Sequence, residues 1–261
     1  MQPEVLQTIS TLLASTDPNE LSAGLALVRS QLSSLNEEDG KSLLEMISAL
    51  FYIDPLDLPG HVPAIEDAIA LVGSMGAWAI PPLLQELGGG DVKAQMAIAQ
   101  ALGHMGAPAI EPLLFEYNAC PEPACQNFIL YALGKVKAPE IIQAVPAALE
   151  AASSIDQEMR DTATRALGKF AESIPVGSLA GDLRTAVIER LRKNMADPNP
   201  ALRAKAVRSL GKLAKHGHLT GRERWELAAA LRRILGQDEN FEWDRAYVVR
   251  KEAKEALEYA Q

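Results

Sequence analysis

The sequence predicts an all-α protein: a right-handed α-solenoid of about six helix pairs with an irregular helical cap at its N-terminus. Aromatic residues make up only 5% of the 261 residues, whereas alanine and leucine are abundant. This bias favours helices over a β-sandwich or barrel. Short strings also recur every 30 to 43 residues. A helix pair of that length buries its apolar face only by stacking on its neighbours, so the recurrence indicates a solenoid.

The first 60 residues fit this recurrence poorly. Their apolar pattern predicts three helices, over residues 3–15, 19–34 and 38–52, with a loop over residues 54–60. Terminal repeats are commonly atypical. We therefore expect one solenoid over residues 1–261, in which residues 1–60 form a degenerate cap and residues 61–261 hold the repeats.

The repeats themselves are visible by eye. The string Ala79–Leu87 recurs 30 residues later as Ala109–Tyr117, and each copy follows a Met-Gly-Ala. Each unit is predicted to be helix, turn, helix. One helix starts with prolines, which are tolerated in a first turn, and the other follows a capping residue. The marker glycines are Gly73, Gly103, Gly134, Gly168 and Gly211, and the expected caps are Asp91, Glu122, Asp156 and Asn199.

Two of these helices carry a known signature. Asp156–Gly168 and Asn199–Gly211 follow the pattern Asp-x-x-Val-Arg-x-x-Ala-x-x-Ala-Leu-Gly, and Val249–Leu257 follows it without the glycine. The pattern resembles HEAT-like repeats, and the short unit is similar to that of the E/F-type phycobilin lyases and their relatives. The resemblance covers residues 61–261. It implies that the Val-Arg helix lines the inner, concave surface, and that the protein forms a hetero-oligomer, because those lyases act as paired subunits.

The charge is unevenly distributed along the chain. Residues 1–156 carry 5 basic and 19 acidic side chains, whereas residues 157–261 carry 20 basic and 15 acidic ones. Residues 184–233 alone hold 13 basic and 4 acidic side chains. Such a dipolar chain can steer a charged partner toward its basic end.

The basic side chains of the second half fall at repeated positions of the Val-Arg helices. The Arg position holds Gln126 and then Arg160, Arg203 and Arg250. Five residues further on lie Tyr131, Arg165 and Arg208, and four residues beyond these lie Lys135, Lys169 and Lys212. Arginine presents a planar fork of donors that suits carboxylates and phosphates. The sequence leaves two interpretations open: these side chains bind an acidic partner, or they pair with acids of the previous repeat and brace the stack, with Asp156 and Asp161 as nearby acids for Arg160.

Aromatic residues gather in the segment 241–247. Trp243 and Tyr247 either close the C-terminal end of the core or anchor a partner, since Trp, Tyr and Arg dominate binding hot spots. Phe241 belongs to the same cluster.

No chemical motif stands out. The four histidines lack the cysteine or acidic neighbours of a metal site, and Cys120 and Cys125 do not have the spacing of a zinc site. Phosphate-loop and nucleophile-elbow motifs are absent. We therefore expect no catalytic residue, metal or cofactor. Two cysteines, no secretory start and no apolar run long enough to cross a membrane predict a cytoplasmic protein.

These observations favour a non-enzymatic scaffold or assembly factor that docks an acidic segment of another protein in the basic C-terminal part of its groove. The alternative is a phycobilin lyase-like protein or a chaperone of tetrapyrrole-bearing proteins, in which the arginines would pair with propionates and Tyr131 would stack on the tetrapyrrole. Nucleic-acid binding ranks third, because the acidic half of the chain would repel a polyanion.

Overall fold

The computed structural model of the chain describes residues 1–34, 37–179, 181–239 and 242–260. Across these residues it has fourteen α-helices and six short 3₁₀ segments. The β-type pairing found among them is one antiparallel bridge between Leu235 and Trp243. The all-α prediction is thus confirmed. The chain divides into two compact units, Met1–Ala119 (unit 1) and Cys120–Gln261 (unit 2).

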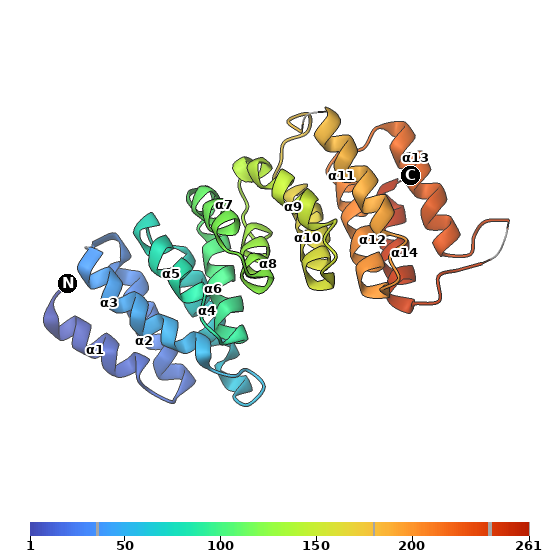
Figure 1. The fold of residues 1–261 in the computed structure, drawn as a ribbon. Helices are drawn as coiled ribbons and strands as arrows, with labels where there is room; N and C mark the ends of the chain where they lie inside the picture. Colours follow the sequence, from blue (N-terminus) through green and yellow to red (C-terminus); the bar gives the residue numbers. More distant parts are fainter. Residues whose placement is uncertain (35–36, 180, 240–241, 261) are drawn as a thin grey trace. The chain divides into compact units, whose positions relative to one another are not determined.

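Unit 1 is a stack of helix pairs (Figure 1). Helix α2 packs on α4 and α4 on α6, while α1 lies against α2 and α5 against α6 and α7. The three helices predicted for the first 60 residues are present, and α2 continues the layer of α4 and α6. The α-helices are α1 (Pro3–Leu13), α2 (Pro18–Gln31), α3 (Glu37–Ser48), α4 (Val62–Gly73), α5 (Ile80–Leu87), α6 (Val92–His104) and α7 (Ile110–Ala119). The 3₁₀ segments are Leu32–Ser34, Ala49–Tyr52, Pro59–His61, Ala77–Ala79 and Ala107–Ala109.

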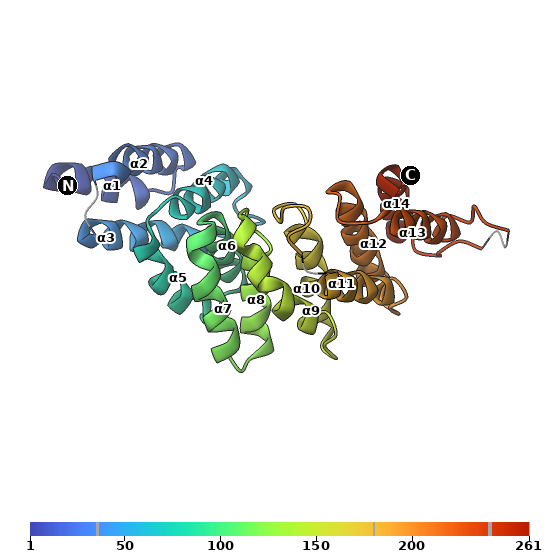
Figure 2. The ribbon, with the colours of Figure 1, turned by 90° about the horizontal axis from the view of Figure 1, so that it is seen from above.

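Unit 2 has two layers of helices (Figures 1 and 2). In one layer α8, α10, α12 and α14 pack side by side, each on the next, and we call this the even layer. Helices α9, α11 and α13 form the second, odd layer, which packs on the first. The α-helices are α8 (Pro123–Leu133), α9 (Val145–Ala151), α10 (Gln157–Phe170), α11 (Gly181–Asn194), α12 (Pro200–Lys215), α13 (Gly221–Ile234) and α14 (Tyr247–Ala260), and a 3₁₀ segment spans Pro139–Ala144.

Side-chain caps start several of the helices that carry the repeat signature. The side chains of Asp91, Asp156 and Asn199 accept hydrogen bonds from backbone N–H groups of the first turns of α6, α10 and α12. Each such cap contributes about 1 kcal/mol. Glu122 precedes α8 as predicted, but its side chain makes no cap hydrogen bond. Its longer side chain is not among the strong capping residues.

The marker glycines allow neighbouring helices to approach closely. A Cβ built on Gly168 would lie 2.3 Å from the Ser209 hydroxyl of α12, and one on Gly211 would lie 2.8 Å from Ala256 Cβ of α14. In unit 1 a Cβ on Gly73 would lie 2.5 Å from His104 Cβ. At Gly73, Gly168 and Gly211 the glycine is therefore a packing requirement, because it is the residue that leaves room for the next helix.

Among the described residues, no single helix has both the length and the apolar character needed to cross a membrane. One sharply bent pair, Pro59–Gly73 with Ala77–Leu87, passes on length and composition alone.

Candidate functional site: a cationic surface on the even layer of unit 2

The arginines at the Arg position share one structural role. In each case one guanidinium nitrogen donates to the backbone carbonyls five and six residues earlier, in the turn before its own helix. For Arg160 these are the carbonyls of Ser154 and Ile155, at 3.0 and 2.8 Å. Arg203 and Arg250 repeat the arrangement with carbonyl distances of 2.6–3.0 Å. Each of these arginines therefore ties a turn to the helix that follows it.

Two of these arginines also bridge to the turn that precedes the next helix of the even layer. Arg160 pairs with Asp197 at 3.3 Å, and Arg203 binds Asp244 through two nitrogens at 2.8 and 2.9 Å. The acids that the sequence suggested for Arg160 are engaged elsewhere: Asp156 caps α10, and Asp161 pairs with Lys205. The acid that braces Arg160 or Arg203 thus comes from the following helix repeat of unit 2. The carbonyls that anchor the guanidinium point it toward that repeat.

The next basic positions are occupied as well. Arg208 pairs with Glu252, with its Nε 2.7 Å from one carboxylate oxygen. Lys212 and Lys169 both contact Glu172, at 2.6 and 3.2 Å. Burial lowers the pKa of Lys212, although Glu172 opposes that effect. Burial alone would raise the pKa of Glu172, but hydrogen bonds from the two lysines outweigh it and hold that pKa below its ordinary value.

The Arg208–Glu252 pair leads to a stability prediction. Glu252 is 2% exposed, so removing its cation leaves a buried charge uncompensated. We expect Arg208→Ala to lower the free energy of unfolding by about 2 kcal/mol, below the usual loss for a buried pair because Arg208 itself is half exposed. Urea unfolding followed by circular dichroism measures this loss. Adding Glu252→Gln should recover part of it, and a double variant as unstable as Arg208→Ala would contradict the explanation.

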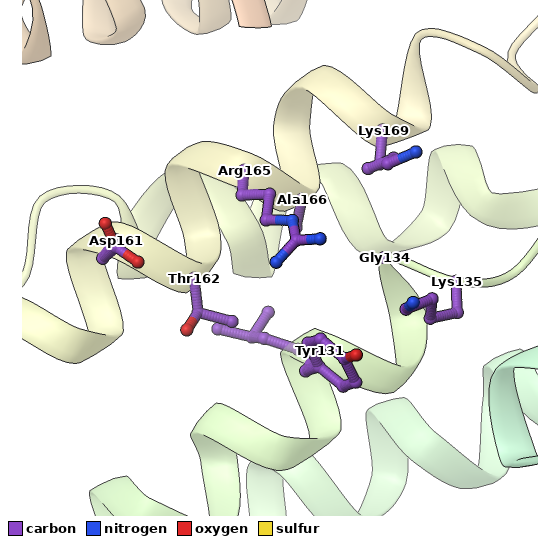
Figure 3. A pocket seen from close by; sticks show the side chains of 9 residues that line it. Tyr131, Gly134, Lys135, Asp161, Thr162, Arg165, Ala166 and Lys169 are labelled. Carbon is purple, nitrogen blue, oxygen red and sulfur yellow. The ribbon is translucent and has the colours of Figure 1, made fainter. Parts of the chain in front are cut away.

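One cationic cluster of the even layer lacks an acidic partner. Tyr131 of α8 lies between Lys135, whose Nζ is 5.1 Å from the ring centroid, and Arg165 of α10, whose Cζ is 5.9 Å from it. Within the described part of the chain, neither cation is paired with a carboxylate. Figure 3 shows Arg165 reaching from α10 toward Tyr131 on the facing helix α8, with Lys135 in the turn that follows α8. These residues line a small pocket of about 50 Å³ together with Leu130, Gly134, Asp161, Thr162, Ala166 and Lys169. Asp161, the carboxylate in this lining, is paired with Lys205.

Cation–aromatic contacts leave the donors of these cations available. Each contact is worth about 0.5–1 kcal/mol at an exposed site and holds the side chain over the ring. The N–H groups at the edge of the guanidinium remain available to an incoming oxygen. The arrangement is thus a pair of positioned positive charges around an aromatic surface, suited to a carboxylate or another small anion. We call Tyr131, Lys135 and Arg165 the Tyr131 cluster.

The structure separates the predicted site residues into groups. Arg160, Arg203, Arg208, Lys169 and Lys212 are engaged with acids of their own unit, and Arg250 with backbone carbonyls, whereas Arg165 has the Tyr131 contact instead. Trp243 and Tyr247 are 62% and 72% exposed, near the start of α14 and outside the Tyr131 pocket. Phe241 lies outside the described residues. Lys135, which occupies the same repeated position as Lys169 and Lys212, was not among the predicted binding residues, and Tyr131 was expected to bind only under the alternative function.

The paired acids of unit 2 give its stability a defined pH dependence. Burial would raise the pKa of Glu223, but hydrogen bonds from Arg184 and Thr220 outweigh it and lower that pKa from 4.5 to about 2. A carboxylate with a depressed pKa stabilises the fold above its unfolded pKa, and this contribution is lost as the pH falls toward the folded value. We expect the urea midpoint to fall as the pH drops from about 4.5 to about 2. Glu223→Gln should have a shallower profile over this range, and an unchanged slope would contradict the assignment.

Fold and surface together define a helical-repeat protein with a small cationic cluster on one layer. No curated protein sequence matches the chain. Residues 80–168 match the family model of HEAT repeats. The resemblance of the Val-Arg helices to HEAT-like repeats is therefore confirmed.

Solved structures agree on the architecture. The complex of CpcE and CpcF of phycocyanin lyase from Nostoc sp. PCC7120 matches with a TM-score of 0.55 and 20% identity, over 69% of this chain and 99% of that chain. Kap121p bound to Nup53p matches with a TM-score of 0.67 and 14% identity, over 99% of this chain. The match covers 29% of Kap121p, so this chain spans less than a third of that protein. At these identities the similarities establish an α-solenoid fold and no more.

Proposed function

We propose that the protein is a binding scaffold that docks an acidic segment of another protein on the even layer of unit 2. The observation that carries the proposal is the Tyr131 cluster, in which Lys135 and Arg165 flank an aromatic ring and have no carboxylate partner among the described residues. Nearly every other cation that the sequence singled out on this layer already has an acid or a carbonyl. A partner's carboxylate would therefore contribute most to the binding free energy at these two unpaired cations.

The size of the pocket favours a peptide over a bound pigment. Pockets that enclose small molecules usually measure about 300–1,000 Å³, whereas the Tyr131 pocket is about 50 Å³. That volume suits one carboxylate group, with the rest of the segment lying across the surface. Kap121p, which shares the solenoid fold, was solved with Nup53p bound, and this use of the fold is consistent with a protein ligand.

The braced arginines have a supporting role in this proposal. Arg160, Arg203 and Arg250 each bind the backbone carbonyls of the turn before their own helix, in three successive helix repeats. The register between α10, α12 and α14 is therefore fixed before any partner arrives. Binding then costs little rearrangement of the scaffold itself. Trp243 and Tyr247 are exposed aromatic side chains that we propose as secondary anchors for a longer partner segment.

Affinity capture from nuclease-treated host lysate tests the proposal. Wild type would be run beside Lys135→Glu/Arg165→Glu, with elution by a peptide rich in aspartate and glutamate. A protein that carries an acidic segment, is released by the peptide and is lost with the variant supports the proposal. Equal capture by both proteins would contradict it. The visible spectrum of the eluate tests the alternative function, since bound pigment lost with the variant would support tetrapyrrole binding through propionates.

A further inference from the structure

The helices of the odd layer are joined by arginine–glutamate pairs. Arg184 of α11 binds Glu223 of α13 at 2.6 Å and also donates to the His218 carbonyl at 3.0 Å. Arg192, eight residues further along α11, binds Glu226 at 2.8 Å. One helix thus presents two arginines, and the next presents two glutamates three residues apart.

Helix α13 repeats the arginines without the acids. Arg224 and Arg232 lie forty residues after Arg184 and Arg192 and have the same spacing of eight. Together with Gly221, Trp225, Ala228 and Ala260 they line an open hollow of about 570 Å³. The side chain of neither arginine has a hydrogen bond or an ion pair to another described residue. The Nε of Arg224 is buried and unsatisfied, which is costly for a polar group. Trp225 is 70% exposed beside them.

The neighbouring face of α14 lacks the small and apolar residues by which the helices of the even layer pack on one another. Lys251, Lys254 and Glu258 of α14 are exposed, although the equivalent positions of α12, 47 residues earlier, are the buried Ala204, Val207 and Gly211. A further helix packed on this face of the even layer would have to bury these charged side chains. Of the two helices at this end of unit 2, only α13 therefore presents the arginines that could bind a further helix.

We infer that the face of α13 formed by Arg224, Trp225, Ala228 and Arg232 docks a single amphipathic helix of a partner protein, in which two glutamates lie three residues apart. The Arg184–Glu223 and Arg192–Glu226 pairs show that this spacing satisfies two arginines eight residues apart. Ala228 is a small buried residue that lines the hollow, and the exposed Trp225 offers an apolar surface to the incoming helix. This face is separate from the Tyr131 cluster, so either can fail without the other.

A helical peptide tests the inference. The probe is a capped helix of alanine, leucine and glutamine that carries two glutamates three residues apart, and the matched peptide has glutamines at those positions. We expect fluorescence anisotropy to show the glutamate peptide binding wild type at least about tenfold more tightly than Arg224→Glu/Arg232→Glu, which corresponds to about 1.4 kcal/mol. Arg233→Glu is the control, because Arg233 lies on the same helix but pairs with Asp238. It should bind like wild type.

Three results would overturn the inference. These are no binding of the glutamate peptide, equal binding of the glutamine peptide, and equal binding by Arg224→Glu/Arg232→Glu when its circular dichroism matches wild type. Sedimentation of wild type tests whether a second copy of the chain occupies this face instead. A self-associated protein that becomes monomeric in Arg224→Glu/Arg232→Glu would assign the face to a second copy of the chain instead of a partner helix.

Discussion

Reversing both charges of the Tyr131 cluster, with Lys135→Glu and Arg165→Glu together, is expected to weaken binding of an acidic partner segment about a hundredfold. Close interfacial charge pairs are coupled by about 1.5 kcal/mol or more each. Losing two of them therefore costs about 3 kcal/mol, or two tenfold steps in affinity. Neither cation braces an acid among the described residues, so the variant should fold as wild type does. The salt dependence of binding should also become shallower, because two fewer positive charges attract the segment.

Isothermal titration with the identified acidic segment measures this effect. The matched control is Arg190→Glu/Lys193→Glu on α11, which reverses the same number of charges on the odd layer. In the described part of the chain, neither of these side chains has a hydrogen bond or an ion pair. The control should retain affinity within about threefold if location matters more than net charge. Equal losses in both double variants would mean that general electrostatic attraction, and not the cluster, governs binding.

The largest stability effect is expected from Gly168→Ala. A Cβ at this position would lie 2.3 Å from the Ser209 hydroxyl and 2.7 Å from Ser209 Cα, so the backbones of α10 and α12 must separate. Overpacking of this kind costs about 3 kcal/mol or more. Alanine would return at most about 1 kcal/mol through its better helix propensity. The net loss is therefore about 2 kcal/mol or more, and separating α10 from α12 would also strain the Arg160–Asp197 bridge.

Gly134→Ala is the matched control, because Gly134 holds the equivalent position in the preceding helix repeat. The nearest atoms to a Cβ there lie at 3.4 Å, an ordinary contact distance, and the backbone has a φ of −65° that alanine adopts freely. We expect this variant to be as stable as wild type or up to about 1 kcal/mol more stable. Chemical denaturation of both variants decides the matter. Equal stability of Gly168→Ala and Gly134→Ala would refute close approach as the reason for the recurring glycine.

The sequence predicted the fold in detail because a solenoid is built from local rules. Capping by Asp91, Asp156 and Asn199, prolines in first turns and the apolar period each act within one helix pair, so each is visible in a short string. The packing function of Gly168 was not visible, because it depends on Ser209 in the next unit. The division into two compact units also has no local signature in the sequence.

The candidate site was predicted only in part, for a similar reason. The repeat register placed Arg165, Arg208 and Lys212 on one layer, but the register cannot tell which cation meets an acid. Glu252 and Glu172, which engage Arg208 and Lys212, stand outside the Arg positions from which the site was inferred. Lys135 occupied the same repeated position as Lys169 and Lys212, and that position was the signal that could have added it to the site.

Photo-cross-linking from position 131 tests the central claim most directly. Wild type carrying p-benzoylphenylalanine in place of Tyr131 would be irradiated with its partner, beside a protein with the same group in place of Phe115, an exposed aromatic residue of unit 1. We expect an adduct from position 131 that maps by mass spectrometry to an acidic segment of the partner and disappears when the charges of Lys135 and Arg165 are reversed. An adduct from position 115 alone, or one from position 131 that persists after charge reversal, would contradict docking at the Tyr131 cluster.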